Sequence, residues 1–417
     1  MGALEDEVSS QLLLPPGFDV TDPDLIETGV PYGEFAKLRT AAPVAWNAQR
    51  RGIGGFDDEG FWLVTRHAEV REVSLKPEVY SSWENTAVVR FMEGISRDEI
   101  EMQRLMMLNV DPPDHTKLRR IVSRGFTPRA IRMIEEALSA RAEAIVKEAV
   151  SRGSGNFVTE VAAELPLQAI AEIIGVPQEE RAKIFDWSNQ MIAYDDPEYD
   201  IDPVVASAEL INYAMALGQD RTENPRDDIV TKLVSADVDG RGLTSDEFAF
   251  FVLLLAVAGN ETTRNAITHG MMGFFQFPDQ WELYKAERPA TTADEVVRWA
   301  TPVIVFQRTA LEDTTLGGVE VKRGQRVGIC YSAANFDPEV FDEPERFDIA
   351  RDPNPHLGFG GGGPHYCLGA NLAKMEINLM FNAIADHMPS VAPAGPARRL
   401  RSAWINGIKE LPVRYAP

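Results

Sequence analysis

Residues 358–369 read GFGGGGPHYCLG, so that four consecutive glycines lie just before the cysteine Cys367. Glycine has no β-carbon, so this backbone can adopt left-handed conformations and lie close against a flat ligand. Residues 370–380 have apolar side chains at helical spacing, which puts Cys367 just before or within the first turn of a helix. The N–H groups at that end of a helix favour an anion, and the thiolate is the form of cysteine that binds a metal. The stretch therefore predicts a metal-binding cysteine beside a glycine loop.

Two other interpretations of this stretch stay open on the residues alone. A lone cysteine is more often a small buried hydrophobe, and a glycine-rich loop before a helix can also bind phosphate. Phosphate is the weaker alternative, because no Lys-Ser or Lys-Thr pair follows the glycines. His365 adds a cationic group just before the sulfur.

The order of these residues resembles the haem-binding loop of the cytochrome P450 superfamily, in which a phenylalanine, glycines, a His or Arg, a Cys and a Gly follow one another. Phe359 lies eight residues before Cys367, one more than is usual in that family, as if a glycine had been inserted. The resemblance implies that Cys367 is the axial ligand of the iron of haem b. It also implies that Phe359, Gly360, His365 and Gly369 contact the haem.

The composition indicates one large domain, residues 1–417. The chain has 44% hydrophobic residues, and no internal repeat, low-complexity segment or long linker divides it. Its net charge of −23 argues against nucleic acid and anionic membrane surfaces as partners. Two cysteines, Cys330 and Cys367, are too few for a disulfide framework. Residues 1–24 lack the pattern of a signal peptide, and the longest apolar run, residues 248–258, is too short to span a bilayer, so we expect a cytoplasmic protein that is not integral to a membrane.

A second informative segment is an apolar helix predicted over residues 248–274, which the polar run AGNETT at residues 258–263 interrupts. Polar residues within a buried helix cost stability unless they are satisfied or used. The structural alternative is a threonine that bonds back to the carbonyl one turn earlier and merely bends the helix. The segment resembles the oxygen-activating helix of the same family. The resemblance implies that Glu261 relays protons, that Thr262 is the catalytic alcohol, and that Ala258, on the same face as Thr262, contacts the haem.

Basic residues elsewhere are candidates for binding the haem carboxylates. His115 and Arg119 are four residues apart in a predicted helix, so both side chains point from one face. On spacing alone, a solvated basic face is the preferred interpretation. In the family, a His-x-x-x-Arg at this place donates to a haem propionate, and Arg308 lies where the family has a second donor. A guanidinium suits bidentate binding of a carboxylate, although an ordinary surface arginine is the alternative.

Three further charged residues are expected to have a role in folding. Glu295 and Arg298 are spaced to pair on one helix, and Arg346 follows downstream. Together they resemble the Glu-x-x-Arg pair of the family and its arginine partner, which implies a buried network beneath the haem. We assign these residues no catalytic role, because replacing one partner would leave a buried charge unpaired.

The resemblance covers essentially the whole chain and implies a mainly α fold with small β-sheets, the cytochrome P450 fold. We expect a strand at residues 60–65 and a terminal hairpin around residues 400–407. The activity implied is the insertion of one atom of dioxygen into an unactivated C–H bond. No flavin or iron-sulfur motif is present in the sequence, so electrons are expected from a ferredoxin and its NAD(P)H-dependent reductase. The basic residues expected to dock the ferredoxin are Lys117, Arg120, Arg124 and Lys374.

The substrate is suggested by a narrower resemblance. Residues 256–265, residues 332–337 and the extended glycine loop resemble the actinobacterial steroid C26-monooxygenases, which oxidise the terminal methyl group of the cholesterol or cholest-4-en-3-one side chain in sterol catabolism. A relative that hydroxylates methyl-branched fatty acids shares the glycine loop and is the second candidate. A peroxide-driven haem enzyme and a haem carrier or gas sensor are the alternatives from other classes, and the proton-delivery motif disfavours both. The candidates for the pocket wall, each of which could instead be core, are Val88, Phe91, Met191, Phe250, Val257, Val305, Phe306 and Trp404.

Overall fold

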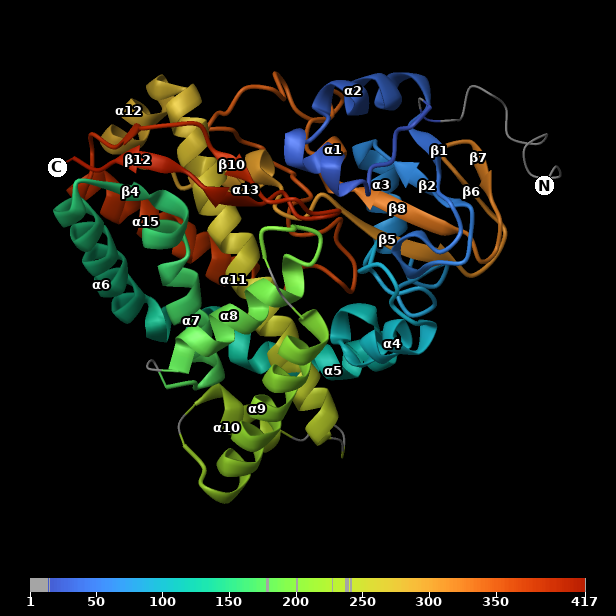
Figure 1. Ribbon diagram of the computed structural model, residues 1–417, viewed down its shortest axis with the longest axis horizontal. Helices are drawn as coiled ribbons and strands as arrows, with labels where there is room; N and C mark the ends of the chain where they lie inside the picture. The colour runs from blue at the N-terminus through green and yellow to red at the C-terminus, as the bar shows by residue number, and fades with distance from the viewer. Residues whose placement is uncertain are drawn as a thin grey trace.

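The computed structural model describes residues 14, 16–177, 180–199, 202–226, 228–236, 240 and 242–416. Most of residues 1–24, to which the expectation about a signal peptide refers, therefore lies outside the described residues. Helices make up most of the molecule, and the largest sheet lies at one side, where the N-terminal part of the chain is (Figure 1). The expectation of a mainly α fold with small sheets is confirmed. No helix among the described residues has both the length and the apolar character needed to cross a membrane.

The α-helices are α1 (Pro23–Thr28), α2 (Tyr32–Ala41), α3 (His67–Leu75), α4 (Arg97–Met102), α5 (Asp114–Val122), α6 (Pro128–Arg152), α7 (Glu164–Ile174), α8 (Arg181–Ile192), α9 (Pro203–Glu223), α10 (Ile229–Val234), α11 (Ser245–Gln276), α12 (Pro278–Glu287), α13 (Thr292–Ala300), α14 (Tyr331–Ala334) and α15 (Ala370–His387). Short helical turns are η2 (Ile53–Gly55), η3 (Gln103–Leu105), η4 (Met107–Asn109), η5 (Ser123–Phe126) and η6 (Val158–Ala162). The strands are β1 (Val44–Ala48), β2 (Gly60–Val64), β3 (Tyr80–Ser81), β4 (Ser154–Asn156), β5 (Val305–Ala310), β6 (Thr314–Leu316), β7 (Val319–Val321), β8 (Arg326–Cys330), β9 (Ala392–Pro393), β10 (Arg398–Arg399), β11 (Ile408–Glu410) and β12 (Pro412–Arg414).

The long helix α11 runs through the middle of the molecule and packs against α7, α8, α9, α13 and α15 (Figure 1). It begins with a capping box, in which the Thr244 hydroxyl accepts from the Glu247 N–H at 3.1 Å and the Glu247 carboxylate accepts from the Thr244 N–H at 2.9 Å. The polar run at residues 258–263 does not break the helix. A β-carbon at Gly259 would lie 2.3 Å from Cδ1 of Ile170, so this glycine lets α7 approach closely.

The main sheet has the strand order β1-β2-β8-β5-β3. β2 and β8 are parallel, with Trp62 opposite Val327, and the other neighbours are antiparallel. The predicted strand at residues 60–65 is β2, which is buried along its whole length. Near the C-terminus, β10 and β11 pair around residues 400–407, as expected for a hairpin. The sheet matters for the site because β5 carries Arg308 into the interior.

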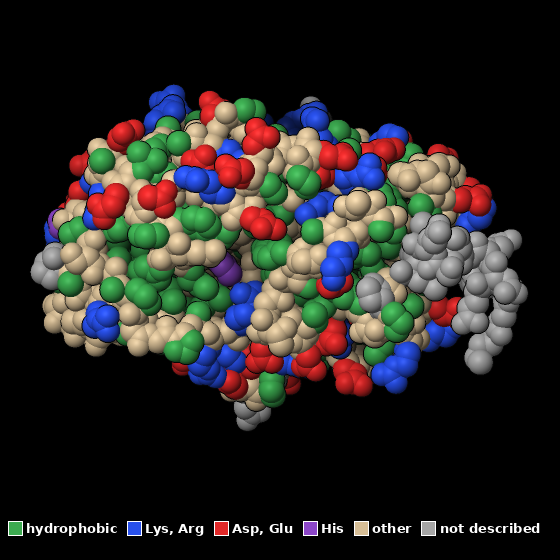
Figure 2. Space-filling view, turned by 90° about the horizontal axis from the view of Figure 1, so that it is seen from above, with side chains coloured by type: hydrophobic (Ala, Val, Ile, Leu, Met, Phe, Trp, Pro, Cys, Tyr) green, Lys and Arg blue, Asp and Glu red, His purple; other side chains and the backbone are tan. Residues whose placement is uncertain are grey.

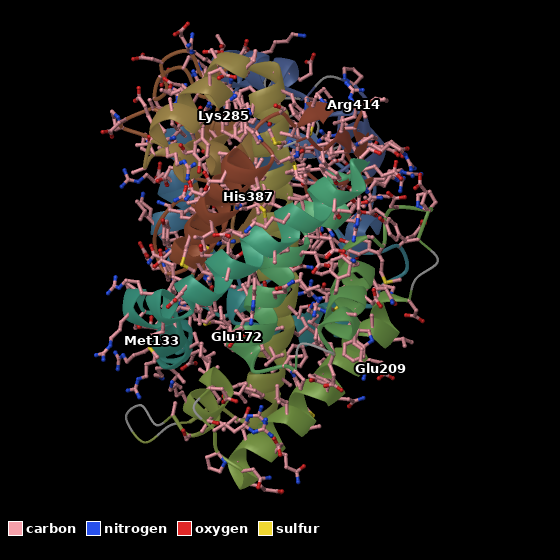
Figure 3. The ribbon with its side chains drawn as sticks, turned by 90° about the vertical axis from the view of Figure 1, so that its left-hand side faces the viewer. Met133, Glu172, Glu209, Lys285, His387 and Arg414 are labelled. Atoms are coloured by element: carbon pink, nitrogen blue, oxygen red, sulfur yellow. The ribbon has the colours of Figure 1, made fainter. Side chains whose placement is uncertain are left out.

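Side chains of the helical part form one large apolar core, which extends in sequence from Met106 to Tyr415. Figure 3 shows α6 lying across α15, with Met133 towards one end of α6 and His387 on α15. The surface seen from above carries basic and acidic side chains interspersed, with apolar side chains between them (Figure 2).

Candidate active site

A cavity lies between α11 and α15, and α5, β5 and the glycine loop close it. The residues expected to bind the haem all lie in its wall although they come from distant parts of the sequence: His115, Arg119, Ala258, Arg308, Phe359, Gly360, His365, Cys367 and Gly369. Thr262 lies in the same wall. The fold therefore brings together side chains that the sequence separates by up to about 250 residues.

The glycine loop packs against the end of α3, and this packing requires glycine. Gly360, Gly362 and Gly363 have φ of +95°, +93° and +70°, which L side chains rarely adopt. A β-carbon at Gly361 would lie 2.3 Å from the Ser74 hydroxyl oxygen, and one at Gly363 would lie 2.3 Å from the Ser74 carbonyl oxygen. The loop follows this course because Gly360, Gly362 and Gly363 adopt positive φ, and because Gly361 and Gly363 have no β-carbon to meet Ser74.

Cys367 lies immediately before α15 and its sulfur faces the cavity. Its N–H donates to the carbonyl of Phe359 at 2.9 Å, which fixes the loop relative to the sulfur. Burial raises the pKa of the Cys367 thiol, and the N–H of Gly369 and the charge of Arg119 oppose this shift without overcoming it. The helix end alone therefore does not supply the expected thiolate. A coordinating metal removes a thiol proton outright, so the residue fits a metal ligand.

Four basic side chains gather in the cavity wall: His115, Arg119, Arg308 and His365. The rings of the two histidines lie 4.3 Å apart, and the buried Nδ1 of His115 has no hydrogen-bond partner. Burial lowers the pKa of all four groups, and the two arginines repel a charge on His115, whose pKa falls to about 4. In the described part of the chain, no carboxylate lies within ion-pairing distance of either guanidinium.

An anionic ligand would relieve this repulsion and satisfy the orphaned nitrogen. Haem carries two carboxylates and a metal. The wall offers the four basic side chains as donors to the carboxylates and the sulfur of Cys367 as a ligand to the metal. The residues present fit the group.

The two residues expected to act on dioxygen face different surroundings. Thr262 lies in the cavity wall, and its hydroxyl donates to the Ala258 carbonyl at 2.6 Å. This is the hydrogen bond expected of a threonine that bonds back to the carbonyl one turn earlier. Glu261 is buried and does not line the cavity. Its carboxylate accepts from Arg264, one turn further along α11, and from Nδ2 of Asn265 at 2.8 Å.

Glu295 and Arg298 form the buried pair that their spacing predicts, with Nε and Nη2 of Arg298 at 2.7 and 2.8 Å from the two carboxylate oxygens. The structure corrects the expectation for Arg346. Its guanidinium lies 3.6 Å from Asp279 and its side chain is 48% exposed. Arg351 completes the network instead, with Nε 3.2 Å from Glu295. Arg346 contributes only its carbonyl, which accepts from Arg298 and Arg351 at 3.0 and 3.1 Å.

Of the apolar residues expected in the substrate pocket, Phe306 lies in the wall of this cavity. Trp404 lies beside it, with ring centroids 5.9 Å apart. The others, and Trp404, pack in clusters around the wall: Val88 and Phe91 beside Ile100, Val305 in the N-terminal core, Phe250 and Met191 in the large helical core, and Val257 and Trp404 beside Leu400 and Ile405.

On α11 the cavity wall is made by Phe251, Leu254 and Leu255 rather than by Phe250 and Val257. The sequence contained the signal for this choice. Counting back from Thr262 in helical steps reaches Ala258, then the leucine pair and then Phe251, whereas the two expected residues lie one position off that stripe.

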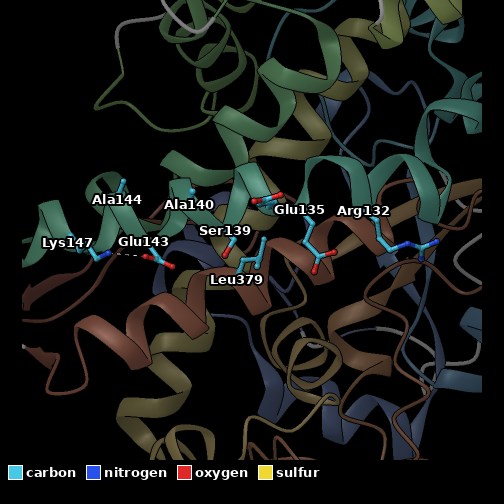
Figure 4. Close-up of a pocket in the computed structure, with 9 residues that line it drawn as sticks. Arg132, Glu135, Ser139, Ala140, Glu143, Ala144, Lys147 and Leu379 are labelled. Atoms are coloured by element: carbon cyan, nitrogen blue, oxygen red, sulfur yellow. Dashed lines mark hydrogen bonds and ion pairs between the residues drawn. The ribbon is translucent and has the colours of Figure 1, made fainter.

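A second hollow lies along α6 where that helix faces α15 (Figure 4). Its lining is mostly charged and small side chains of α6, with Leu379 from α15. Lys147 and Glu143 pair at 2.9 Å along α6, one turn apart. None of the expected site residues lies here, so the cavity beside Cys367 is the candidate active site.

Comparison with known proteins agrees with this assignment. A family model described as cytochrome P450 matches residues 290–387. The chain is 62% identical over 414 residues to a steroid C26-monooxygenase of Rhodococcus jostii, covering 99% of this chain and 88% of the relative. It is 39% identical to a methyl-branched lipid omega-hydroxylase of Mycobacterium tuberculosis, covering 96% of each chain. A solved cytochrome P450 of Mycobacterium marinum, in complex with pseudoionone, superimposes with a TM-score of 0.90 at 34% identity, covering 98% of this chain and all of that one. With such identity over nearly its whole length, the protein belongs to the cytochrome P450 family of haem-thiolate monooxygenases.

Proposed function

We propose that this protein hydroxylates the terminal (C26/C27) methyl group of a cholesterol or cholest-4-en-3-one side chain, and carries the oxidation on to the carboxylic acid, in sterol catabolism. The observation that carries the proposal is the 62% identity, over 99% of the chain, to an enzyme named steroid C26-monooxygenase. The character of the cavity supports it. Phe251, Leu254, Leu255 and Phe306 present apolar surface, which suits a branched hydrocarbon tail.

The chain's own side chains have distinct roles in this proposal. Cys367 would ligate the iron of haem b, and thiolate ligation would supply an electron-rich iron suited to oxygen activation. His115, Arg119, Arg308 and His365 would bind the haem carboxylates, and apolar side chains make up most of the wall on α11. Thr262 offers its hydroxyl to a water in the cavity, and the substrate tail excludes bulk water from it.

Electrons must come from a redox partner, and we propose a ferredoxin with its NAD(P)H-dependent reductase. On α5, Lys117 and Arg120 are exposed while His115 faces the cavity, so one short helix connects the surface to the site. Arg124 is exposed just beyond this helix, whereas Lys117 pairs with Asp114 at 2.8 Å and Lys374 pairs with Asp294 at 2.5 Å, so both lysines are less available. Charge reversal at Arg124 should slow reduction in a salt-dependent way, and unchanged reduction rates would argue against this docking face.

The second candidate function is omega-hydroxylation of methyl-branched lipids, which the 39% identity to an enzyme of that name supports. The two substrates share a branched methyl terminus and differ in the rest of the molecule, so the reacting end of the cavity could accept either. We infer further that the chain acts as a single domain, because one apolar core includes side chains from residue 106 to residue 415. A cytoplasmic location stays a prediction.

The test is an optical titration of the purified ferric protein with cholest-4-en-3-one and, separately, with a methyl-branched fatty acid. Displacement of water by an apolar ligand shifts the Soret band towards its high-spin position. A tight, saturable shift with the steroid, followed by the C26 alcohol or acid in product analysis, supports the proposal. A shift with the fatty acid alone transfers support to the second candidate.

A matched pair of variants tests the cavity wall in the same titration. Phe251→Leu changes a side chain in the wall, whereas Phe250→Leu makes the same change one position away in the core. We expect Phe251→Leu to weaken steroid binding by about 10-fold, the value of a few lost methylene contacts, and Phe250→Leu to leave it within about 2-fold. Equal effects of the two variants would show that another cavity binds the steroid.

A further inference from the structure

A strained segment of backbone is bound to β5, the strand that contributes Phe306 to the cavity wall. Thr86 has φ of +62°, which β-branched residues rarely adopt, and its side chain is fully buried. Its hydroxyl has no hydrogen-bond partner in the described part of the chain. Backbone strain and an unpaired buried hydroxyl both cost free energy, so the surroundings must fix residues 85–87, which we call the strap.

Gln307 of β5 binds the strap on both sides of Thr86. Its Nε2 donates to the Asn85 carbonyl at 3.0 Å, and its backbone N–H donates to the Ala87 carbonyl at 2.8 Å. The N–H of Ala87 donates to the buried side chain of Asn109 at 2.8 Å. The strap is therefore fixed by two amide side chains from distant parts of the sequence.

Gln307 is itself oriented by a buried cation. Its Oε1 accepts from Nη1 of Arg326 at 3.0 Å. Arg326 is 1% exposed and makes two hydrogen bonds to Asp58, each of 2.6 Å. Because the guanidinium can only donate, the oxygen of the Gln307 amide faces Arg326 and its nitrogen faces the strap. Gln49 also accepts from Arg326, at 3.0 Å, but its own amide nitrogen donates to side chains that precede α1.

The strap and Phe306 belong to one closed chain of contacts. Side chains alternate along a strand, so Gln307 points away from the cavity while its neighbour Phe306 faces it. The rings of Phe306 and Trp404 lie 5.9 Å apart between centroids. Nε1 of Trp404 donates to the Tyr194 hydroxyl at 3.1 Å, which donates to the Arg90 carbonyl at 2.9 Å. Since Arg90 follows the strap in the sequence, the chain of contacts returns to Gln307.

We propose that Gln307 is a positioning residue that selects for a rigid substrate. It keeps the strap in its strained conformation, and through the strap, Tyr194 and Trp404 it fixes the ring of Phe306 in the cavity wall. A fused-ring steroid needs a wall in one position, whereas a flexible fatty acid adapts to a wall that has moved. This role rests on the proposed function and deepens it, because it names a residue that favours the steroid over the branched lipid.

The first experiment needs no substrate. Amide hydrogen exchange of the holoenzyme, followed by mass spectrometry, reports the protection of residues 86–88. Gln307→Leu removes the amide group, and we expect exchange in this segment to become about 10-fold faster, the value of about one hydrogen bond. Gln49→Leu is the matched control, because it takes an acceptor from Arg326 without a contact to the strap. Unchanged exchange in Gln307→Leu, or equal acceleration in both variants, would overturn the proposal whatever the substrate is.

The second experiment repeats the optical titration with both ligands. Gln307→Leu should weaken cholest-4-en-3-one binding by about 10-fold and leave the methyl-branched fatty acid and the turnover at saturating substrate within about 2-fold. A purely structural role would affect both ligands alike. Glycine adopts positive φ readily, so adding Thr86→Gly removes the strain and should recover most of the steroid affinity.

Equal weakening of the two ligands in Gln307→Leu, or no recovery in the double variant, would refute the role. If the unaltered protein gives no spectral shift with the steroid, the proposed function fails instead. The two failures are distinguishable, because hydrogen exchange tests the strap without any ligand.

Discussion

Replacing Arg351 with methionine should destabilise the protein far more than the same replacement at Arg346. Methionine keeps much of the length of the side chain and removes its charge and donors. Arg351 is 9% exposed and pairs with Glu295 at 3.2 Å, and it donates to three backbone carbonyls within residues 342–346, at 2.7 to 3.3 Å. Arg346 is half-exposed and lies 3.6 Å from Asp279.

The magnitude follows from what each change leaves behind. Removing one partner of a buried ion pair costs about 3–5 kcal/mol, but Glu295 keeps Arg298 and two further donors, Asp348 N–H at 2.8 Å and Asn354 at 3.0 Å. Each of the three carbonyls loses a charged donor, at about 1 kcal/mol apiece. Taken together, Arg351→Met should lower the free energy of unfolding by about 3–4 kcal/mol. The exposed pair at Arg346 is worth less than about 1 kcal/mol, and the carbonyl of that residue stays in place in the variant.

The assay is urea unfolding of the holoenzymes, followed by far-ultraviolet circular dichroism and by the Soret band. A shift of the midpoint at constant slope reports a change in stability alone. We expect a large shift for Arg351→Met with earlier loss of the Soret band, and almost none for Arg346→Met. Equal shifts for the two variants, or a change below about 1 kcal/mol for Arg351→Met, would refute the corrected network.

Four further outcomes can be checked. Gly33 lies in α2, and a β-carbon added there would have no heavy atom within 4 Å, so Gly33→Ala should raise stability by about 0.5–1 kcal/mol in thermal denaturation. Gly259→Ala should cost about 1–3 kcal/mol through contact with Ile170, and adding Ile170→Val should recover part of that loss in the same assay. Arg308→Met should speed loss of haem to apomyoglobin by about 10-fold, because one charged donor to a carboxylate is removed. Burial raises the pKa of Glu376 from 4.5 to about 8, so between those pH values the folded protein keeps a proton that the unfolded chain has released. The free energy of unfolding should therefore fall by about 1.4 kcal/mol for each rise of one pH unit because of this group. In urea titrations from pH 5 to 8, Glu376→Gln should flatten this dependence on pH.

Local patterns, through the family resemblance that they carry, allowed a large part of the site to be predicted from the sequence. The glycine run, the His-x-x-x-Arg spacing and the Glu-x-x-Arg pair each lie within one loop or one helical turn, where the chain itself fixes which groups are neighbours. The structure brings Cys367, His115 and Arg119 into one cavity, and it pairs Glu295 with Arg298 as the spacing requires. The mainly helical fold, which the resemblance implied, is also confirmed.

The rest depended on information that short patterns do not contain. Arg346 and Arg351 lie in the same irregular segment between α14 and α15. Only tertiary packing determines that Arg351 turns inward to Glu295 while Arg346 turns outward. The prediction of the residues in the pocket wall was wrong for a different reason. An apolar run such as residues 248–258 has no polar face of its own to show its rotation. Only counting back from Thr262 sets that rotation, and choosing Phe250 over Phe251 was an error of one helical position.

The same geometry limits what an acid next to an alcohol can do on a helix. Consecutive residues project about 100° apart on a helix, and the cavity wall takes Thr262 and Thr263 from α11 while Glu261 lies outside it. The structure has the alcohol in the wall and the acid beside Arg264, whose Nη1 reaches Asn189 of α8 at 3.1 Å. If Glu261 relays protons, as the resemblance implies, its proton has to travel around the helix, and its release from Arg264 also disturbs the contact between α11 and α8. A displacement of α8 should therefore change any proton transfer through Glu261, because Asn189 of α8 accepts from the arginine that holds this carboxylate.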